Sequence, residues 1–220
     1  MQARRVDESL GNETMPTWIA DRDLEQRLQA ERKASGADRY DEVWEGVYVM
    51  APMANNEHQK LATRLATCIS NALGFDSDAD VYAGVNVSDR ADDWKLNYRV
   101  PDVAVLLPGC SAHDRGTFIL GGPDFLVEIV SPDDRSYDKF DFYAQIGVRE
   151  LLIVTRDPWA LELYQLRDGA LARVGRCGVG DELAVTSAVL QLHFRLIPGA
   201  AKQRPWIEVT SNAPQDRWRV

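Results

Sequence analysis

The sequence predicts an α/β domain with a mixed central sheet, helices on its flanks and extra strands toward the C-terminus. Three observations predict it. Apolar residues recur at helical spacing in residues 58–73, and two apolar runs with strand character lie at 101–107 and 125–130. Further strand-like runs follow residue 150. A chain of 220 residues is long enough for one such domain with peripheral additions.

The two ends of the chain differ in composition from the part between them. Residues 1–16 are polar and without periodicity, so we expect them to be disordered. Residues 17–198 form the single predicted domain. Residues 199–220 form a C-terminal arm whose Trp206 and Trp218 would pack against a neighbouring subunit, because large aromatic residues are enriched in interfaces. The alternative is that this tail folds back onto its own domain.

Two helices and a hairpin are predicted before the first long strand. Thr17 caps a first helix that runs to about residue 33, and residues 40–50 form a hairpin that turns near Glu45. Asn55 or Asn56 caps a second, amphipathic helix. The residues that recur at helical spacing along it are His58, Leu61, Ala62, Leu65, Ala66, Ile69, Ala72 and Leu73.

Glycines, prolines and polar residues bound the remaining predicted elements. A helix over about 133–146 ends at Gly147, a suitable C-terminal cap. Residues 89–97 and 109–123 form polar loops. The further strands that we expect cover 81–87, 151–155, 160–166, 171–174, 183–186 and 191–197.

Glu128 lies inside the apolar run 125–130, which otherwise has the pattern of a buried strand. An ionised carboxylate in such a strand is costly unless a cation or a hydrogen-bond donor compensates it. Because side chains alternate along a strand, Leu126, Glu128 and Val130 share one face. Glu128 is therefore a candidate metal ligand. The alternative is that it pairs with a buried arginine such as Arg99.

A second carboxylate, Asp102, begins the strand run 101–107. Pro101 suits a strand start, because proline cannot donate a hydrogen bond to a sheet ladder. The helix after the second run carries Lys139 and Tyr143, which are four residues apart and face the same side. Two strand carboxylates and a nearby lysine predict a divalent-metal site with a charge stabiliser. The alternatives are that Asp102 only bonds backbone groups and that Lys139 is solvated.

Composition narrows the class of protein. The net charge of −9 argues against indiscriminate nucleic-acid binding, although it leaves room for a local basic groove. The sequence shows no apolar stretch of membrane-spanning length and no secretory hydrophobic region, so we expect no membrane association. Its three cysteines are widely spaced and fit neither a zinc site nor a disulfide framework. We therefore expect a cytoplasmic protein.

An ordered set of motifs carries a resemblance. It comprises Pro101-Asp102, Val127-Glu128-Ile129-Val130-Ser131-Pro132, Asp138-Lys139, Tyr143 and Gly147-Val148-Arg149-Glu150-Leu151, preceded by the segment 40–52 and by His58. Over about residues 38–168 the chain resembles the Uma-type restriction endonuclease family, a branch of the PD-(D/E)XK nuclease superfamily. The superfamily places a lysine two residues after the strand acid, where this chain has Val130. The family commonly moves that lysine to the following helix, as Lys139 would.

The resemblance implies a restriction-endonuclease-like core and an endodeoxyribonuclease that hydrolyses phosphodiester bonds of DNA. Asp102 and Glu128 would hold Mg²⁺, or Mn²⁺ as a substitute, with help from the Ile129 carbonyl. Lys139 would orient or activate the attacking water. These three side chains are the expected catalytic set.

Four further residues are candidates for supporting roles. Glu42 or Glu45 would supply another acid, and the alternative is that acids in a hairpin are simply exposed. His58 lies in the first turn of its helix, where packing is the competing interpretation. Tyr143 is as compatible with the core as with the site.

Two other classes of function remain open at this point. One is a non-catalytic nucleic-acid-binding or scaffold protein that keeps the nuclease fold, and the other is a metal-binding regulatory module. The acidity of the chain favours these alternatives, whereas the intact set of Asp102, Glu128 and Lys139 favours the enzyme. We also expect a symmetric homodimer, the commonest oligomer, to which residues after Pro198 contribute contacts.

Overall fold

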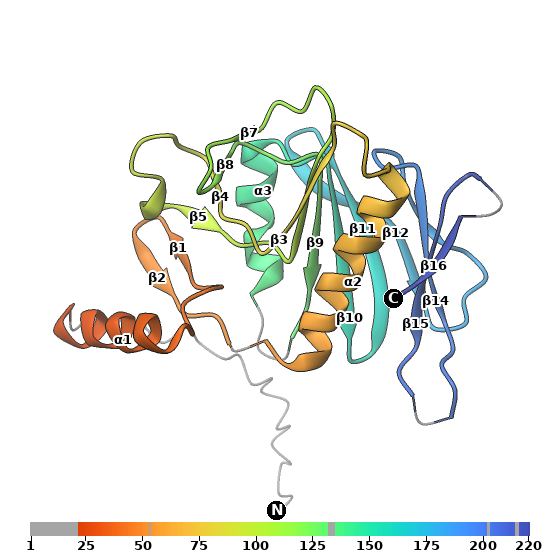
Figure 1. The fold of residues 1–220 in the computed structure, drawn as a ribbon, viewed down its shortest axis with the longest axis horizontal. Coiled ribbons are helices and arrows are strands. Elements are labelled where there is room, and N and C mark those ends of the chain that lie inside the picture. The colour runs from red at the N-terminus through yellow and green to blue at the C-terminus, as the bar shows by residue number, and fades with distance from the viewer. Residues whose placement is uncertain (1–21, 53, 132–134, 202, 214–215) are drawn as a thin grey trace, which may run out of the picture.

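The computed structural model describes residues 22–52, 54–131, 135–201, 203–213 and 216–220 (Figure 1). The predictions for residues 1–16, for Thr17 and for the start of the helix near residue 133 lie outside these ranges. The predicted class is confirmed: the chain is a mixed α/β protein with few helices and extra C-terminal strands.

The central sheet has the strand order β12-β11-β10-β9-β6-β3. Strands β9 and β10 are parallel and are joined through the short helices η2 and α3, whereas the other neighbours are antiparallel. A parallel pair requires such a crossover. The bounds are β3 Asp80–Ala83, β6 Val103–Leu106, β9 Phe125–Ile129, η2 Ser136–Lys139, α3 Phe140–Ile146, β10 Glu150–Arg156, β11 Trp159–Arg167 and β12 Ala170–Gly178.

Helices α2 (Asn56–Leu73) and α3 cover opposite faces of this sheet (Figure 1). The alternation of strand β9 decides which side chains meet which helix. Phe125, Val127 and Ile129 share one apolar cluster with the buried face of α2. Leu126 lies in the other cluster, with Phe142 and Tyr143 of α3. Glu128 has the parity of Leu126 and so lies on the α3 side, as the strand period predicts.

A second sheet carries the N-terminal hairpin in the order β2-β1-β5-β4-β8-β7. Helix α1 (Arg22–Ser35) lies beside it (Figure 1). The hairpin turns at Glu45 as expected, although the backbone joins β1 to β5 at a single pair of residues, Val43 and Tyr98. The strand bounds are β1 Glu42–Trp44, β2 Val47–Val49, β4 Val87–Ser88, β5 Tyr98–Arg99, β7 His113–Asp114 and β8 Ile119–Leu120, with the 3-10 helix η1 at Trp94–Leu96.

Two predictions for this region are wrong. The single strand expected over 81–87 is divided into β3 and β4, because Gly84 adopts a φ of +64° and turns the chain. A Cβ atom at Gly84 would lie only 2.8 Å from the ring of Tyr40. The loop expected over 109–123 also contains short strands, β7 and β8, one of which extends the second sheet beside β4.

The C-terminal residues form a third sheet in the order β13-β14-β15-β16, which packs beside strands β11 and β12 of the central sheet (Figure 1). Its bounds are β13 Val185–Ser187, β14 Leu192–Ile197, β15 Trp206–Thr210 and β16 Arg217–Arg219. Ile207, Val209 and Val220 are buried in the same cluster as Phe194. The tail after Pro198 therefore folds back onto its own chain, the alternative named above. Homodimer formation stays a prediction.

Candidate active site

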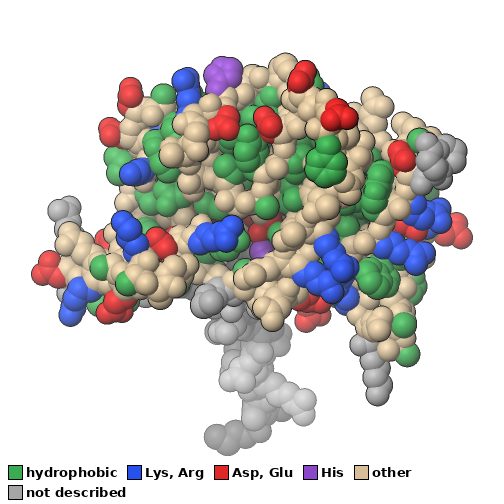
Figure 2. Space-filling model, in the orientation of Figure 1, with side chains coloured by type: hydrophobic (Ala, Val, Ile, Leu, Met, Phe, Trp, Pro, Cys, Tyr) green, Lys and Arg blue, Asp and Glu red, His purple; other side chains and the backbone are tan. Residues whose placement is uncertain are grey.

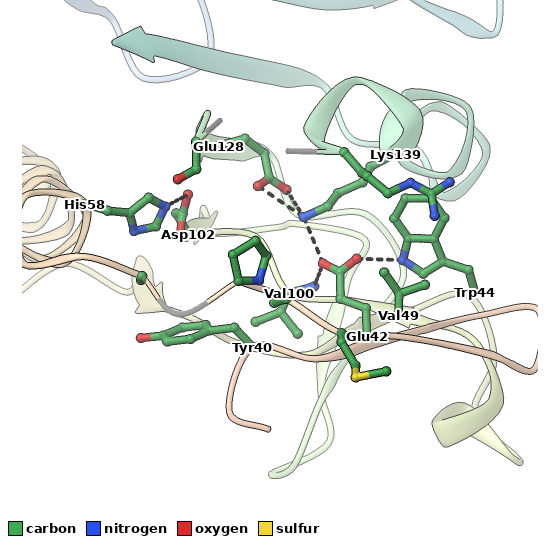
Figure 3. A pocket seen from close by; sticks show the side chains of 15 residues that line it. Tyr40, Glu42, Trp44, Val49, His58, Val100, Asp102, Glu128 and Lys139 are labelled. Carbon is green, nitrogen blue, oxygen red and sulfur yellow. Dashed lines mark hydrogen bonds and ion pairs between the residues drawn. The ribbon is translucent and has the colours of Figure 1, made fainter. Parts of the chain in front are cut away.

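A recess of about 170 Å³ lies between the N-terminal hairpin and the ends of strands β6 and β9 (Figure 3). Of the seven side chains predicted for the site, five line it: Glu42, His58, Asp102, Glu128 and Lys139. The antiparallel register of β6 and β9 explains the meeting of the two strand acids. Val103 stands opposite Val127, and this register continued by one residue puts Asp102 beside Glu128.

Glu128 is held in this recess at 3% exposure by two donors from the crossover. The Tyr143 hydroxyl donates to its Oε1 atom at 2.5 Å, and Lys139 Nζ lies 3.0 and 3.2 Å from its two oxygens. Burial raises the pKa of Glu128, and repulsion from Asp102 and Glu42 adds to that effect, so that the pKa is about 8 despite the opposing charge of Lys139. Glu128 thus holds its proton more tightly than an ordinary glutamate.

Lys139 lies where the displaced lysine was expected. It ends the 3-10 helix η2, and its Nζ atom lies 2.8 Å from Glu42 Oε1 as well as beside Glu128. The predicted proximity of Lys139 to the strand acid is confirmed. One ammonium group is therefore shared by two buried carboxylates from elements far apart in the sequence (Figure 3).

Glu42 is the hairpin acid that reaches the recess. Trp44 Nε1 donates to its Oε2 atom at 2.6 Å, and the backbone N–H of Val100 donates to Oε1 at 2.8 Å. Neither donor was predicted from the sequence. The pattern Glu-x-Trp in a strand could have indicated the first, because residues two apart share a face. The second depends on a pairing between distant segments.

Asp102 is fixed by the neighbouring strand and by helix α2. The backbone N–H of Ile129 donates to its Oδ2 atom at 2.7 Å, and His58 Nε2 lies 3.2 Å from the same oxygen. His58 is placed there because Asn55 caps α2 and accepts a hydrogen bond from the His58 backbone N–H. His58 is thus a neighbour of the strand acid and not only a packing residue.

Two other expectations need correction or replacement. Glu45 does not reach the recess: its side chain is 70% exposed and binds Arg90 and Asn97. Its backbone occupies the turn with a φ of +47°, which directs the residue away from the site. Arg99 does not pair with Glu128. Its guanidinium lies between the rings of Trp44 and Phe142, 4.5 and 4.2 Å from their centroids.

Tyr143 belongs to both the core and the site. It is fully buried in the α3 cluster, and its hydroxyl faces Glu128. Burial, followed by the charges of Glu128 and Glu42, raises its pKa well above the ordinary value. The hydroxyl therefore stays protonated and acts as a permanent donor to Glu128.

The donor set of the recess is compatible with a hard divalent cation. Three carboxylates face it, and its cationic side chains are Lys139 and Arg135, the second of which pairs with Asp138. Mg²⁺ typically takes one or two carboxylates and keeps several waters, which Asp102, Glu128 and a backbone carbonyl could accommodate. Within the described residues, no group of three or more His, Cys, Asp or Glu side chains is arranged to hold a metal by itself.

Among the comparisons with known proteins, one shows the family and another shows a similar fold. A family model described as "Putative restriction endonuclease", Uma2, matches residues 24–196. No curated protein matches the chain. A crystal structure from Anabaena variabilis ATCC 29413, titled as a putative nuclease belonging to DUF820, has a similar fold. It shares 17% identity at a TM-score of 0.55, with 68% of this chain and 83% of that chain covered.

No helix in the described ranges combines the length and apolar character needed to cross a membrane. The family model spans most of the chain, and the site assembles the acids and the displaced lysine of the expected pattern. This chain belongs to the Uma2 family of restriction-endonuclease-like proteins.

Proposed function

We propose that the protein is a Mg²⁺-dependent endodeoxyribonuclease that hydrolyses phosphodiester bonds. The observation that carries the proposal is the shared Lys139, whose ammonium contacts Glu128 and Glu42 beside Asp102 in one recess. Hydrolysis of a phosphodiester needs an oriented water and a stabilised extra negative charge. A lysine between carboxylates can help with both tasks.

Asp102, Glu128 and the Ile129 carbonyl would hold the cation. When bound, Mg²⁺ would supply charge stabilisation at the phosphate and a more acidic water. Lys139 would then turn its N–H groups toward the attacking water and the phosphate oxygens. Glu42 would hold Lys139 in place, and Tyr143 would fix the Glu128 carboxylate through its hydrogen bond. His58 would fix Asp102.

The test is a cleavage assay on supercoiled, linear duplex, nicked and single-stranded DNA with Mg²⁺, with Mn²⁺ and with a chelator. We expect metal-dependent cleavage by the native chain and a loss of at least about a hundredfold in Glu128→Gln and Asp102→Asn. Glu162→Gln is the matched control, because this carboxylate lies on the same sheet outside the recess.

Cleavage that survives in both Glu128→Gln and Asp102→Asn would contradict the assignment of the activity to this recess. Binding of DNA without cleavage by the native chain, in either metal, would contradict the proposal and favour the non-catalytic alternative.

A further inference from the structure

The recess that holds the acids shares part of its lining with a second recess. The second recess, of about 150 Å³, is lined by Arg39, Gln59 and Thr63 among others. Both recesses are also lined by Tyr40, His58 and Asp102. Asp102 therefore borders both recesses, an arrangement compatible with a chain-like ligand that passes the acids instead of ending at them.

Each end of this path carries an arginine. Arg135 lines the first recess and is 41% exposed, with its guanidinium 4.3 Å from the Trp44 ring and its Nε bound to Asp138. Arg39 lines the second recess and is also exposed, with its guanidinium 5.4 Å from the Tyr40 ring. Figure 2 shows further Lys and Arg side chains gathered beside α2 in the lower part of one face, although the chain as a whole is acidic.

The wall opposite Asp102 and Glu128 carries aromatic and apolar side chains beside Glu42. Tyr40 and Trp44 contribute rings (Figure 3), and Met50 and Pro52 also line the recess. Aromatic side chains in a path with cationic ends are the features that bind single-stranded nucleic acid, because every base has a face that stacks. Tyr40 is held against Gly84, where any larger residue would displace the ring.

The depth of the acids selects against an intact duplex. Glu42, Asp102, Glu128 and Lys139 are all buried. The phosphates of a stacked duplex lie on its outer surface. One of them can reach the buried acids only if the nucleotides that flank it leave the stack and enter the recess. Unstacking costs a few kcal/mol per nucleotide, and least where the strand is already unpaired.

We propose that the path through the two recesses binds an unpaired DNA strand, with Arg39 and Arg135 on its phosphates and Tyr40 against a base. The inference deepens the proposed function, on which it rests, by naming single-stranded DNA or an unpaired flap as the preferred substrate. Trp44 keeps its position through Glu42 and so serves mainly as the platform under Arg135.

Binding is measured first, without metal, by fluorescence anisotropy of a labelled single-stranded oligonucleotide and of the same strand in a blunt duplex. We expect the single strand to bind at least about tenfold more tightly. Tyr40→Leu should weaken single-strand binding by about five- to a hundredfold, whereas Tyr40→Phe keeps the ring and should restore it.

The two arginines are tested through the salt dependence of binding. Arg39→Gln combined with Arg135→Gln should lower the slope of log affinity against log salt by about 1.4, or about 0.7 per lost phosphate contact. Arg115→Gln is the matched control, since Arg115 is an exposed arginine in the β7–β8 connection, outside both recesses. It should leave the slope unchanged.

Cleavage rates on single-stranded, flapped and blunt duplex DNA complete the test. Equal binding and equal cleavage of blunt duplex and single strand, with no effect of the arginine changes, would overturn this inference and leave the nuclease proposal intact. Arginine-dependent single-strand binding without cleavage of any DNA would support the inference and reject the catalytic proposal.

Discussion

Glu128 and Glu162 are two carboxylates in one row of the central sheet, and their environments shift their pKa values in opposite directions. Both stand in register with Ile153, Glu128 from β9 and Glu162 from β11. Glu128 shares its one lysine with Glu42 and lies near Asp102. Glu162 has two arginines of its own, with Arg173 at 2.9 Å and Arg176 at 3.3 Å.

The pKa values of the two groups follow these surroundings. Burial raises the pKa of Glu128 to about 8, because one shared cation does not offset it and the neighbouring acids add to it. Burial also acts to raise the pKa of Glu162, but hydrogen bonds from Tyr164 and Tyr137 and the charge of Arg173 outweigh it, so the pKa is lowered. Glu162 thus stabilises the fold as a carboxylate, whereas Glu128 has too little positive charge nearby to offset its burial.

The largest expected effect concerns the shared lysine. Lys139→Met should lower DNA cleavage by at least about a hundredfold, because it removes the charge between Glu128 and Glu42. Arg173→Met removes a cation from Glu162 and should change cleavage less than twofold. Initial rates on one substrate, with circular dichroism to confirm folding, measure both. Equal losses of cleavage in the two variants would show that Glu128 and Glu162 do not differ in function.

The second effect is on stability and has a defined sign. Between the ordinary glutamate value of 4.5 and about 8, the folded metal-free chain binds a proton at Glu128 that the unfolded chain releases. Its unfolding free energy therefore falls with rising pH in that window, at a limiting slope of about 1.4 kcal/mol per pH unit. Glu128→Gln lacks this term, so it should gain stability relative to the native chain as the pH rises. Urea unfolding at pH 5 and pH 8 measures the difference; a constant difference would refute it.

Glu162 should show the opposite sign. Its folded pKa lies below the ordinary 4.5, so its contribution is fully present above that value and is lost as the pH falls through the folded pKa. At pH 7, Glu162→Gln should cost about 1.5–3 kcal/mol, the contribution of hydrogen bonds to a charged group. The cost should shrink as the pH falls below the ordinary value of 4.5 and through the folded pKa. Urea midpoints at pH 7 and in acid test this, and a cost that grows in acid would contradict the assignment.

The smallest expected effect is a shift of the pH–rate profile, which should distinguish Tyr143 beside Glu128 from Tyr164 beside Glu162. Tyr143→Phe removes a hydrogen bond that lowers the pKa of Glu128, so the pKa should rise and the acid limb of the pH–rate profile should move to higher pH, by less than about one unit. Tyr164→Phe removes the corresponding donor to Glu162 and should leave the profile in place. A profile that shifts equally in both variants would indicate a change of fold and not of the local bond.

The sequence contained much of this contrast, but unevenly. The apolar run around Glu128 and the spacing of Lys139 predicted that the two would meet, because a strand and the helix after it are local elements. The choice of Glu42 over Glu45 was not accessible. It depends on a left-handed turn residue and on a donor from Val100, a segment distant in the chain. Trp44 lies within the predicted hairpin, but its contact with Glu42 was not predicted.

The fold was predictable where the apolar periodicity was strong, and it was not predictable where a glycine determined a turn of the chain. Helix α2 and strands β9 to β11 follow apolar patterns that few other structures satisfy. The break at Gly84 was missed, because most of the segment from Val81 to Val87 is β-branched or aromatic, and the positive φ of Gly84 is not visible in that pattern. Short strands such as β7 and β8 depend on pairing with distant partners, which composition does not encode.

The single backbone pair between β1 and β5 has a consequence for how the site opens in time. Beyond this pair, the hairpin that carries Glu42 is attached through the backbone bond from Gly46 to the Leu96 carbonyl and through side chains, Arg99 to the Val43 carbonyl and Glu42 to the Val100 N–H. Segments held by few ladder bonds open locally at much lower free energy than the whole molecule unfolds. In deuterated solvent, the amides of β1 and β2 should exchange well before those of β9 and β10. The hairpin side of the recess would then open locally while the central sheet stays folded.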